Sequence, residues 1–171
     1  MKTYIYFIRH GDTTNPDQIW YGNLPGFGLS KKGVLQIEKT AKYFLRLHID
    51  FIYCSPLLRA RQSAEILKDK LGLKKIYLSQ KITEVIASYD VFSATGRHII
   101  GETIEELSER MQDFISQIAK LHKGKRIIVV SHGDPVMVVK AHSAGLPIKN
   151  SSIRPGRKDY IKEGEIYLLK I

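Results

Sequence analysis

Hydrophobic positions follow two periods along the chain. Short, nearly continuous apolar runs are typical of strands, and they cover residues 4–8, 51–54 and 127–130. Residues 75–78 form a weaker strand candidate, and residues 151–154 and 165–170 are two further candidates. Apolar side chains that recur every three or four positions are typical of helices with one buried face, and they cover residues 30–48, 55–72, 102–121 and 135–144. Strands that alternate with amphipathic helices predict an α/β fold around a largely parallel sheet.

Capping residues predict where these helices begin and end. Ser30 is the expected N-cap of the first helix. Ser55 is the expected N-cap of the second helix, with Pro56 in its first turn and Gly72 at its end. The entirely apolar run 127–130 is expected in the centre of the sheet. The apolar face of the first helix is expected to comprise Val34, Ile37, Ala41, Phe44 and His48.

The composition is that of an ordinary globular protein. The chain has 171 residues, of which 43% are hydrophobic and 26% are charged; residues 1–171 are therefore expected to form a single domain. No apolar run approaches the ~18 residues of a membrane helix, and no secretory signal is recognisable. The single cysteine, Cys54, allows no internal disulfide. These features predict a cytoplasmic protein without a membrane segment.

The net charge of +10 has two interpretations. The lysines are spread along the chain, which favours a solvated surface. A positive field would also attract anionic ligands. Nucleic acid is the less favoured partner, because no RNA-binding aromatic motif and no zinc-finger spacing accompanies the charge.

Residues suited to phosphate binding follow three of the predicted strands. Arg9, His10 and Gly11 come after the first, Arg59 follows the second closely, and His132 comes directly after Ser131 at the end of the run 127–130. Ligands of open α/β sheets bind beyond the carboxyl ends of the strands. We therefore expect these side chains to converge on one crevice.

Each of these groups has a chemical use there. A neutral imidazole at His10 can accept a phosphoryl group without a metal, and a neighbouring arginine keeps it unprotonated. The guanidinium groups of Arg9 and Arg59 can each donate two parallel hydrogen bonds to a phosphate group. A protonated His132 can donate to another oxygen. Arg59 is expected in the first turn of a helix, where the helix dipole favours anions. A phosphate-binding role therefore explains its position better than a structural one.

Five segments together resemble one known family. They are Arg9-His10-Gly11, Leu29 to Gln36, Ser55 to Ala60, Gly101-Glu102-Thr103 with Arg110, and Ser131-His132-Gly133. In this order they resemble the histidine phosphatase superfamily, in its phosphoglycerate-mutase-like branch. The resemblance extends over nearly the whole chain. It implies a three-layer α/β/α sandwich with a mostly parallel, approximately six-stranded mixed sheet that includes one antiparallel strand.

The resemblance also implies an activity. The chain is expected to be a metal-independent phosphatase that hydrolyses phosphomonoesters through a phosphohistidine intermediate on His10, with no cofactor. Arg9, Arg59 and His132 would complete the phosphate pocket. Glu84 is the favoured general acid and Asp134 is the alternative, because a carboxyl group must stay protonated to serve the leaving group.

Departures from the family pattern keep alternatives open. The stretch between Arg59 and His132 is too short for the basic insertion of mutases, which argues against a phosphoglycerate-mutase-like phosphoryl transferase. Asn15 lies one position early for the family's asparagine. A non-catalytic phosphate-binding module is the third interpretation. The substrate is expected to be a phosphorylated small molecule or a phosphoprotein, and the expected substrate contacts are Trp20, Tyr21 and Arg97.

Other chemistries fit the residues less well. Four residues separate Cys54 from Arg59, whereas cysteine phosphatases need five. Ser131 is not in a Gly-x-Ser-x-Gly elbow, and no Gly-x4-Gly-Lys loop is present. A metal site that uses both histidines is disfavoured, because Arg9 and Arg59 beside it would repel a cation.

Overall fold

The computed structural model describes residues 1–19, 21–85, 87–89, 99–147 and 158–171, and the statements below refer to these residues. The elements along the chain are β1 (Tyr4–Arg9), α1 (Lys31–Phe44), β2 (Phe51–Cys54), α2 (Leu58–Leu71), β3 (Ile76–Leu78), the short 3₁₀ helix η1 (Gln80–Ile82), β4 (Ala87–Tyr89), β5 (Ile99–Gly101), α3 (Ile104–Leu121), β6 (Arg126–Ser131), α4 (Gly133–Ser143) and β7 (Ile166–Lys170).

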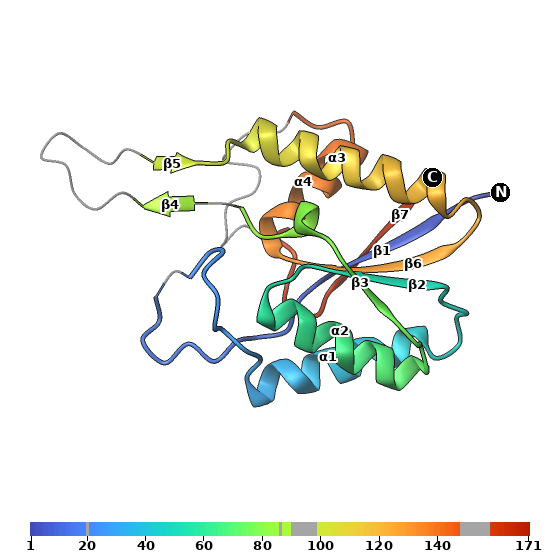
Figure 1. The fold of residues 1–171 in the computed structure, drawn as a ribbon, viewed down its shortest axis with the longest axis horizontal. Helices are drawn as coiled ribbons and strands as arrows, with labels where there is room; N and C mark the ends of the chain where they lie inside the picture. The colour runs from blue at the N-terminus through green and yellow to red at the C-terminus, as the bar shows by residue number, and fades with distance from the viewer. Residues whose placement is uncertain (20, 86, 90–98, 148–157) are drawn as a thin grey trace, which may run out of the picture.

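The fold is built around one five-stranded sheet. Its strand order is β3-β2-β6-β1-β7, in which the first four strands are parallel and β7 runs antiparallel to β1. Helices α1 and α2 cover one face, and α3 and α4 cover the other (Figure 1). The α/β/α sandwich is therefore confirmed, as is the central position of the run 127–130 within β6.

The pleat of the strands divides the core between the two faces. Ile5 and Phe7 of β1 pack with α3 and α4, whereas Tyr6 and Ile8 pack with α1 and α2. Because alternate side chains of a strand point to opposite faces, a fully apolar strand such as β6 is buried on both sides. Both halves of the core meet at the strands that end in the candidate site.

The expectation of about six strands in the sheet was wrong by one for the described residues, which place five there. The predicted strand 151–154 lies outside the described residues. Two short strands that the pattern did not indicate, β4 and β5, pair with each other in a separate ribbon. This ribbon projects beyond the carboxyl ends of the parallel strands (Figure 1).

Helix ends were predicted with mixed success. Ser30 is the N-cap of α1, where its hydroxyl accepts the Gly33 N–H at 3.0 Å. The predicted apolar face was wrong at two positions: Val34 is exposed on the helix, and His48 lies beyond the helix end. Gly72 ends α2 with the left-handed backbone (φ 66°) that glycine adopts readily.

The start of α2 differs from the prediction for a reason that concerns the site. The helix begins at Leu58, after an N-cap at Leu57 that makes no side-chain capping bond. The Ser55 hydroxyl accepts the Leu57 N–H at 3.3 Å and also shares a hydrogen bond of 2.8 Å with His132. Ser55 therefore joins the turn to the second histidine instead of capping the helix.

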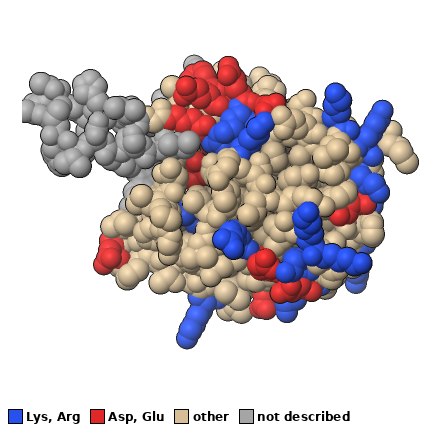
Figure 2. Space-filling model, in the orientation of Figure 1, with Lys and Arg blue, Asp and Glu red and all other residues tan. Residues whose placement is uncertain are grey.

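The surface agrees with a dispersed positive charge. Figure 2 shows Lys and Arg side chains scattered over much of the visible face, with one group of Asp and Glu near its top and others among the basic side chains lower down. Among the described helices, none is both long and apolar enough to cross a membrane.

Candidate active site

The candidate site lies where β1 and β6 end. These strands are parallel neighbours with Arg9 opposite Ser131, so His10 and His132 leave the sheet at the same level. Their rings lie 5.1 Å apart between centroids, in an edge-to-face arrangement. A cavity of about 200 Å³ opens beside them, and it is lined by Arg9, His10, Ile19, Tyr21, Gly22, Glu84, Val85, Asp134 and Tyr160.

The hydrogen bonds of His10 assign its tautomer. Its Nδ1 lies 2.8 Å from the Gly11 carbonyl oxygen, which can only accept, so Nδ1 carries the proton. Its Nε2 faces the Arg59 Nε–H at 3.2 Å and therefore presents a lone pair. Burial lowers the pKa of His10 to about 3, against the opposing effect of the Gly11 hydrogen bond and with help from the Arg59 and Arg9 charges. The ring is neutral at physiological pH.

Arg59 reaches this position from the first turn of α2. It is 1% exposed, and its guanidinium lies 4.8 Å from the centroid of the Tyr21 ring. It also donates to the carbonyl oxygens of Gly22 and Leu24 in the loop that follows β1. The cation is thus held by a ring, two carbonyls and the His10 lone pair, and burial lowers its pKa.

His132 is completely buried and underpaired. Its Nε2 shares the hydrogen bond with Ser55, whereas its Nδ1 has no partner among the described residues. Burial holds the pKa of His132 well below its ordinary value, and His10, Arg59 and Arg9 add to this effect. Burial and these three basic groups therefore oppose the predicted protonation of the second histidine in this structure. An ionised ring would lie among three basic groups and away from solvent.

Arg9 is only partly available for an anion. Its guanidinium donates to the Ile161 carbonyl at 2.9 Å and forms an ion pair with Glu163 at 2.7 Å. Its Nε is buried and has no partner among the described residues. Some of the Arg9 donors that were expected to bind phosphate are thus occupied by the segment before β7. The sequence did not indicate this contact.

Glu84 enters the cavity from the loop after η1. Its Oε1 accepts the N–H of the adjacent Val85 at 3.0 Å. Burial raises the pKa of Glu84 to about 8, and the nearby Asp134 carboxyl contributes. The loop is held by Arg110, whose Nη1 donates to the carbonyls of Lys81 at 2.6 Å and Thr83 at 3.2 Å. A carboxyl group with this pKa retains its proton near neutrality and can act as an acid.

Asp134 faces the same cavity from the first turn of α4. The Tyr160 hydroxyl donates to its Oδ1 at 2.6 Å. Burial raises the pKa of Asp134, while the Tyr160 bond and the Arg9 charge oppose that rise. The two carboxyl groups considered for proton transfer are therefore neighbours.

The remaining predicted site residues are distributed unevenly. Tyr21 lines the cavity, whereas Trp20 and Arg97 lie outside the described residues. Asn15 exchanges hydrogen bonds with the backbone of Ile19 and so closes its own loop. Cys54 is buried, and burial raises the pKa of its thiol, in keeping with core packing.

The sequence did not indicate Tyr160 or Glu163. Tyr160 is 26 positions from Asp134 in the chain, and no motif or spacing connects the two. Only the return of the chain toward β7 brings this segment to the site. The donor set is also unsuited to a cation, because Arg9 and Arg59 flank His10 and the second ring is bonded to Ser55.

Comparisons with known proteins show the family of the chain. A family model described as the histidine phosphatase superfamily (branch 1) matches residues 5–87 and 72–155. A probable phosphoglycerate mutase from Enterobacter sp. (strain 638) is 30% identical over 164 residues, which cover 84% of this chain and 75% of that protein. An adenosylcobalamin/alpha-ribazole phosphatase from Escherichia coli (strain K12) is 24% identical over 163 residues, which cover 84% and 80%.

The fold is shared with a solved structure. A solved structure titled mycobacterial hydrolase 1 superposes with a TM-score of 0.81 at 18% identity, over 99% of this chain and 92% of that one. Relatives of this chain thus include proteins named as phosphatases and as a mutase. The resemblance carried by the five sequence segments is confirmed, and the chain belongs to branch 1 of the histidine phosphatase superfamily.

Proposed function

We propose that this protein is a metal-independent phosphatase that hydrolyses phosphomonoesters through a phosphohistidine on His10. The observation that carries the proposal is the state of that ring: neutral, with its proton on Nδ1 and its Nε2 lone pair toward the buried Arg59. A neutral imidazole is a nucleophile for phosphorus through its lone pair, once the Arg59 Nε–H that is bonded to Nε2 has moved to a phosphate oxygen. The surrounding cations match the negative charge of a transferring phosphoryl group.

The first half-reaction uses Glu84 as an acid. His10 Nε2 forms a bond to phosphorus while the bond from phosphorus to the ester oxygen breaks. The proton of Glu84 passes to that oxygen, and the alcohol leaves. Arg59 exchanges its carbonyl partners for phosphate oxygens, and Arg9 Nε and His132 Nδ1, both buried without partners in the described structure, supply further contacts.

The second half-reaction restores the enzyme. A water molecule attacks phosphorus, the bond to Nε2 breaks, and the Glu84 carboxylate takes one proton of that water. Inorganic phosphate leaves, and His10 is again neutral with its lone pair on Nε2. Glu84 thus alternates between acid and base, which requires a pKa close to the working pH.

The proposed substrate is a phosphorylated small molecule or a phosphoprotein, with Tyr21 at the rim of the cavity as one contact. A phosphoglycerate-mutase-like transfer is the second candidate, because the Enterobacter relative carries that name. Incubation with 3-phosphoglycerate separates the two: a phosphatase releases inorganic phosphate, and a mutase releases 2-phosphoglycerate.

The proposal is tested by replacing the nucleophile. His10→Ala should lower kcat/KM for p-nitrophenyl phosphate by at least ~10³-fold in the presence of a chelator. It should also abolish an acid-labile, base-stable phosphoryl label on the wild-type protein. His122→Ala is the matched control, since this histidine pairs with Tyr53 away from the cavity. Substantial turnover by His10→Ala in the chelator would overturn the proposal.

A further inference from the structure

Two carboxyl groups face one small cavity. Glu84 and Asp134 both line the space of about 200 Å³ that also contains His10 and Tyr160. Carboxylates that share a buried site do not ionise independently, because the second negative charge is added beside the first. Ionisation of one carboxyl therefore opposes ionisation of the other, and the group with the higher pKa keeps its proton to higher pH.

The contacts of Asp134 favour its ionised form. Its Oδ1 accepts a hydrogen bond of 2.6 Å from the Tyr160 hydroxyl, and a carboxylate accepts such a bond better than a neutral acid does. Asp134 also lies in the first turn of α4, where the helix dipole stabilises a negative charge. Glu84 lies in a loop, where no helix dipole acts on it, and its Oε1 accepts the backbone N–H of Val85 at 3.0 Å.

The position of Tyr160 is built into the fold. A Cβ atom at residue 133 would overlap the Tyr160 hydroxyl, so the ring fits here only because Gly133 has no side chain. The segment around Tyr160 is fastened to α4 by Lys140, which donates to the Asp159 carbonyl at 2.9 Å, and by the Ile161 N–H, which lies 3.4 Å from Met137 Sδ. The bond to Asp134 is therefore a fixed feature of the site.

We propose that Asp134, held by Tyr160, is a positioning residue whose negative charge keeps the proton on Glu84. This inference rests on the proposed function, because it assigns the acid of that reaction. Asp134 donates no proton to the substrate. Its charge makes the loss of the Glu84 proton more difficult, so that Glu84 enters the catalytic cycle as an acid.

Several other charges act on Glu84, and they determine in which direction its pKa moves when the Asp134 charge is removed. Arg59 from α2 and Arg9 from β1 favour its ionised form, whereas burial and the Asp134 carboxylate oppose it. The remaining titratable groups at the described site are His10, His132, Tyr21 and Tyr160, with Glu163 paired to Arg9. Removal of the Asp134 charge therefore leaves two arginines that lower the pKa of Glu84. Glu84 then loses its proton at a lower pH.

The test is the pH dependence of kcat/KM for ethyl phosphate, whose leaving group needs a proton. Asp134→Asn keeps the shape and can still accept the Tyr160 bond. It should move the high-pH limb downward by about one pH unit and retain activity below the new limb. With p-nitrophenyl phosphate, whose leaving group needs no proton, the limb should not move. Glu109→Gln, which removes an exposed charge from α3, is the matched control.

Tyr160→Phe gives a second signature. Without the hydroxyl, Asp134 competes better for the shared proton, so the plateau of kcat/KM for ethyl phosphate should fall several-fold. The high-pH limb should lie at the wild-type pH or above it, whereas Asp134→Asn should move this limb to lower pH.

An unmoved limb in Asp134→Asn, or loss of ethyl phosphate turnover at every pH, would overturn the inference; the second result would make Asp134 the acid itself. If His10→Ala is meanwhile inactive, the proposed function stands and only this inference fails. If His10→Ala keeps its turnover, both fail.

Discussion

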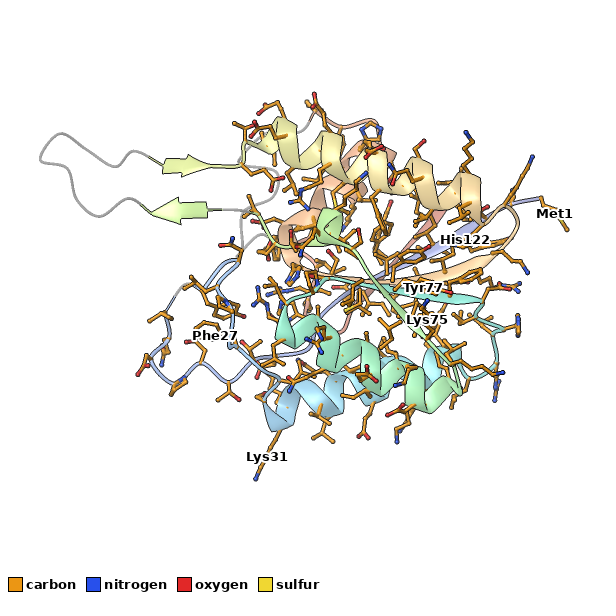
Figure 3. The ribbon with its side chains drawn as sticks, viewed as in Figure 1. Met1, Phe27, Lys31, Lys75, Tyr77 and His122 are labelled. Carbon is orange, nitrogen blue, oxygen red and sulfur yellow. The ribbon has the colours of Figure 1, made fainter. Side chains whose placement is uncertain are left out.

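The two ends of the parallel strands hold similar residue types in different states of pairing. At the carboxyl ends, His132 Nδ1 and Arg9 Nε are buried without a partner among the described residues. Near the amino ends, His122 shares a hydrogen bond of 2.8 Å with Tyr53 and stacks on Phe51 at 3.8 Å between centroids. His122 and Phe27 mark these opposite ends in Figure 3.

Charged groups differ between the ends in the same way. Asp50 near the amino ends accepts the Arg126 N–H at 2.9 Å and the Lys125 ammonium at 3.0 Å. Arg59 at the carboxyl ends is buried against a neutral histidine, a ring and two carbonyls. A buried polar atom without a partner costs stability. The amino ends are thus arranged for stability, and the carboxyl ends keep polar atoms ready for an anion at a cost in stability.

The largest expected effect comes from Arg59→Met. Because one arginine at a phosphoryl-transfer site contributes ~10³–10⁵ in rate, kcat/KM for p-nitrophenyl phosphate should fall by at least ~10³-fold. The free energy of unfolding in urea should change by only about 1–2 kcal/mol. Arg126→Met, whose guanidinium lies over the Tyr4 ring at the amino ends, should keep its activity. Comparable activity in both variants would refute the functional contrast between the ends.

A smaller and more selective effect is expected from Glu84→Gln. Loss of the acid should lower kcat/KM for ethyl phosphate by ~10²–10⁴-fold, and kcat/KM for p-nitrophenyl phosphate much less. The readout is the ratio of the two values in variant and wild type. If both substrates slow equally, the proton comes from another group.

The smallest effect is expected at the amino ends, on stability alone. Burial opposes the ionisation of Asp50, but the Arg126 N–H and Lys125 outweigh it and hold its pKa below the ordinary value. Its contribution is therefore present above the unfolded-state pKa of about 4 and is lost as the pH falls through the lower folded-state pKa. Asp50→Asn should lose about 1 kcal/mol at pH 7 and converge with the wild type in acid. Equal urea midpoints at pH 7 would contradict this.

Glu84 should show the opposite pH dependence in the same unfolding experiment. Its pKa is raised to about 8 in the folded protein. The wild type should therefore lose stability as the pH rises from about 4.5 toward 8, because the unfolded chain releases this proton first. Glu84→Gln should remove that slope and leave the Asp50 effect unchanged.

Sequence reasoning succeeded where a local pattern has one structural solution. The continuous apolar run of β6 could only be a strand buried on both faces, and the Ser30 cap and the Gly72 stop follow from backbone chemistry. The prediction failed where a side chain could form hydrogen bonds with either of two groups. Ser55 was expected to cap α2, but its hydroxyl bonds to His132, 77 positions away in the chain.

What the sequence by itself determined is the order of strands and helices, and with it the meeting of His10, Arg59 and His132, because parallel strands present their carboxyl ends at one edge. The tertiary structure decided the states of these groups. The proton of His10 lies on Nδ1 because of the Gly11 carbonyl, and both histidines are neutral because of burial. It also decided the contacts of Tyr160 and Glu163 with the site. Tautomers, pKa values and long-range ion pairs depend on distances and burial in three dimensions, which no spacing along the chain encodes.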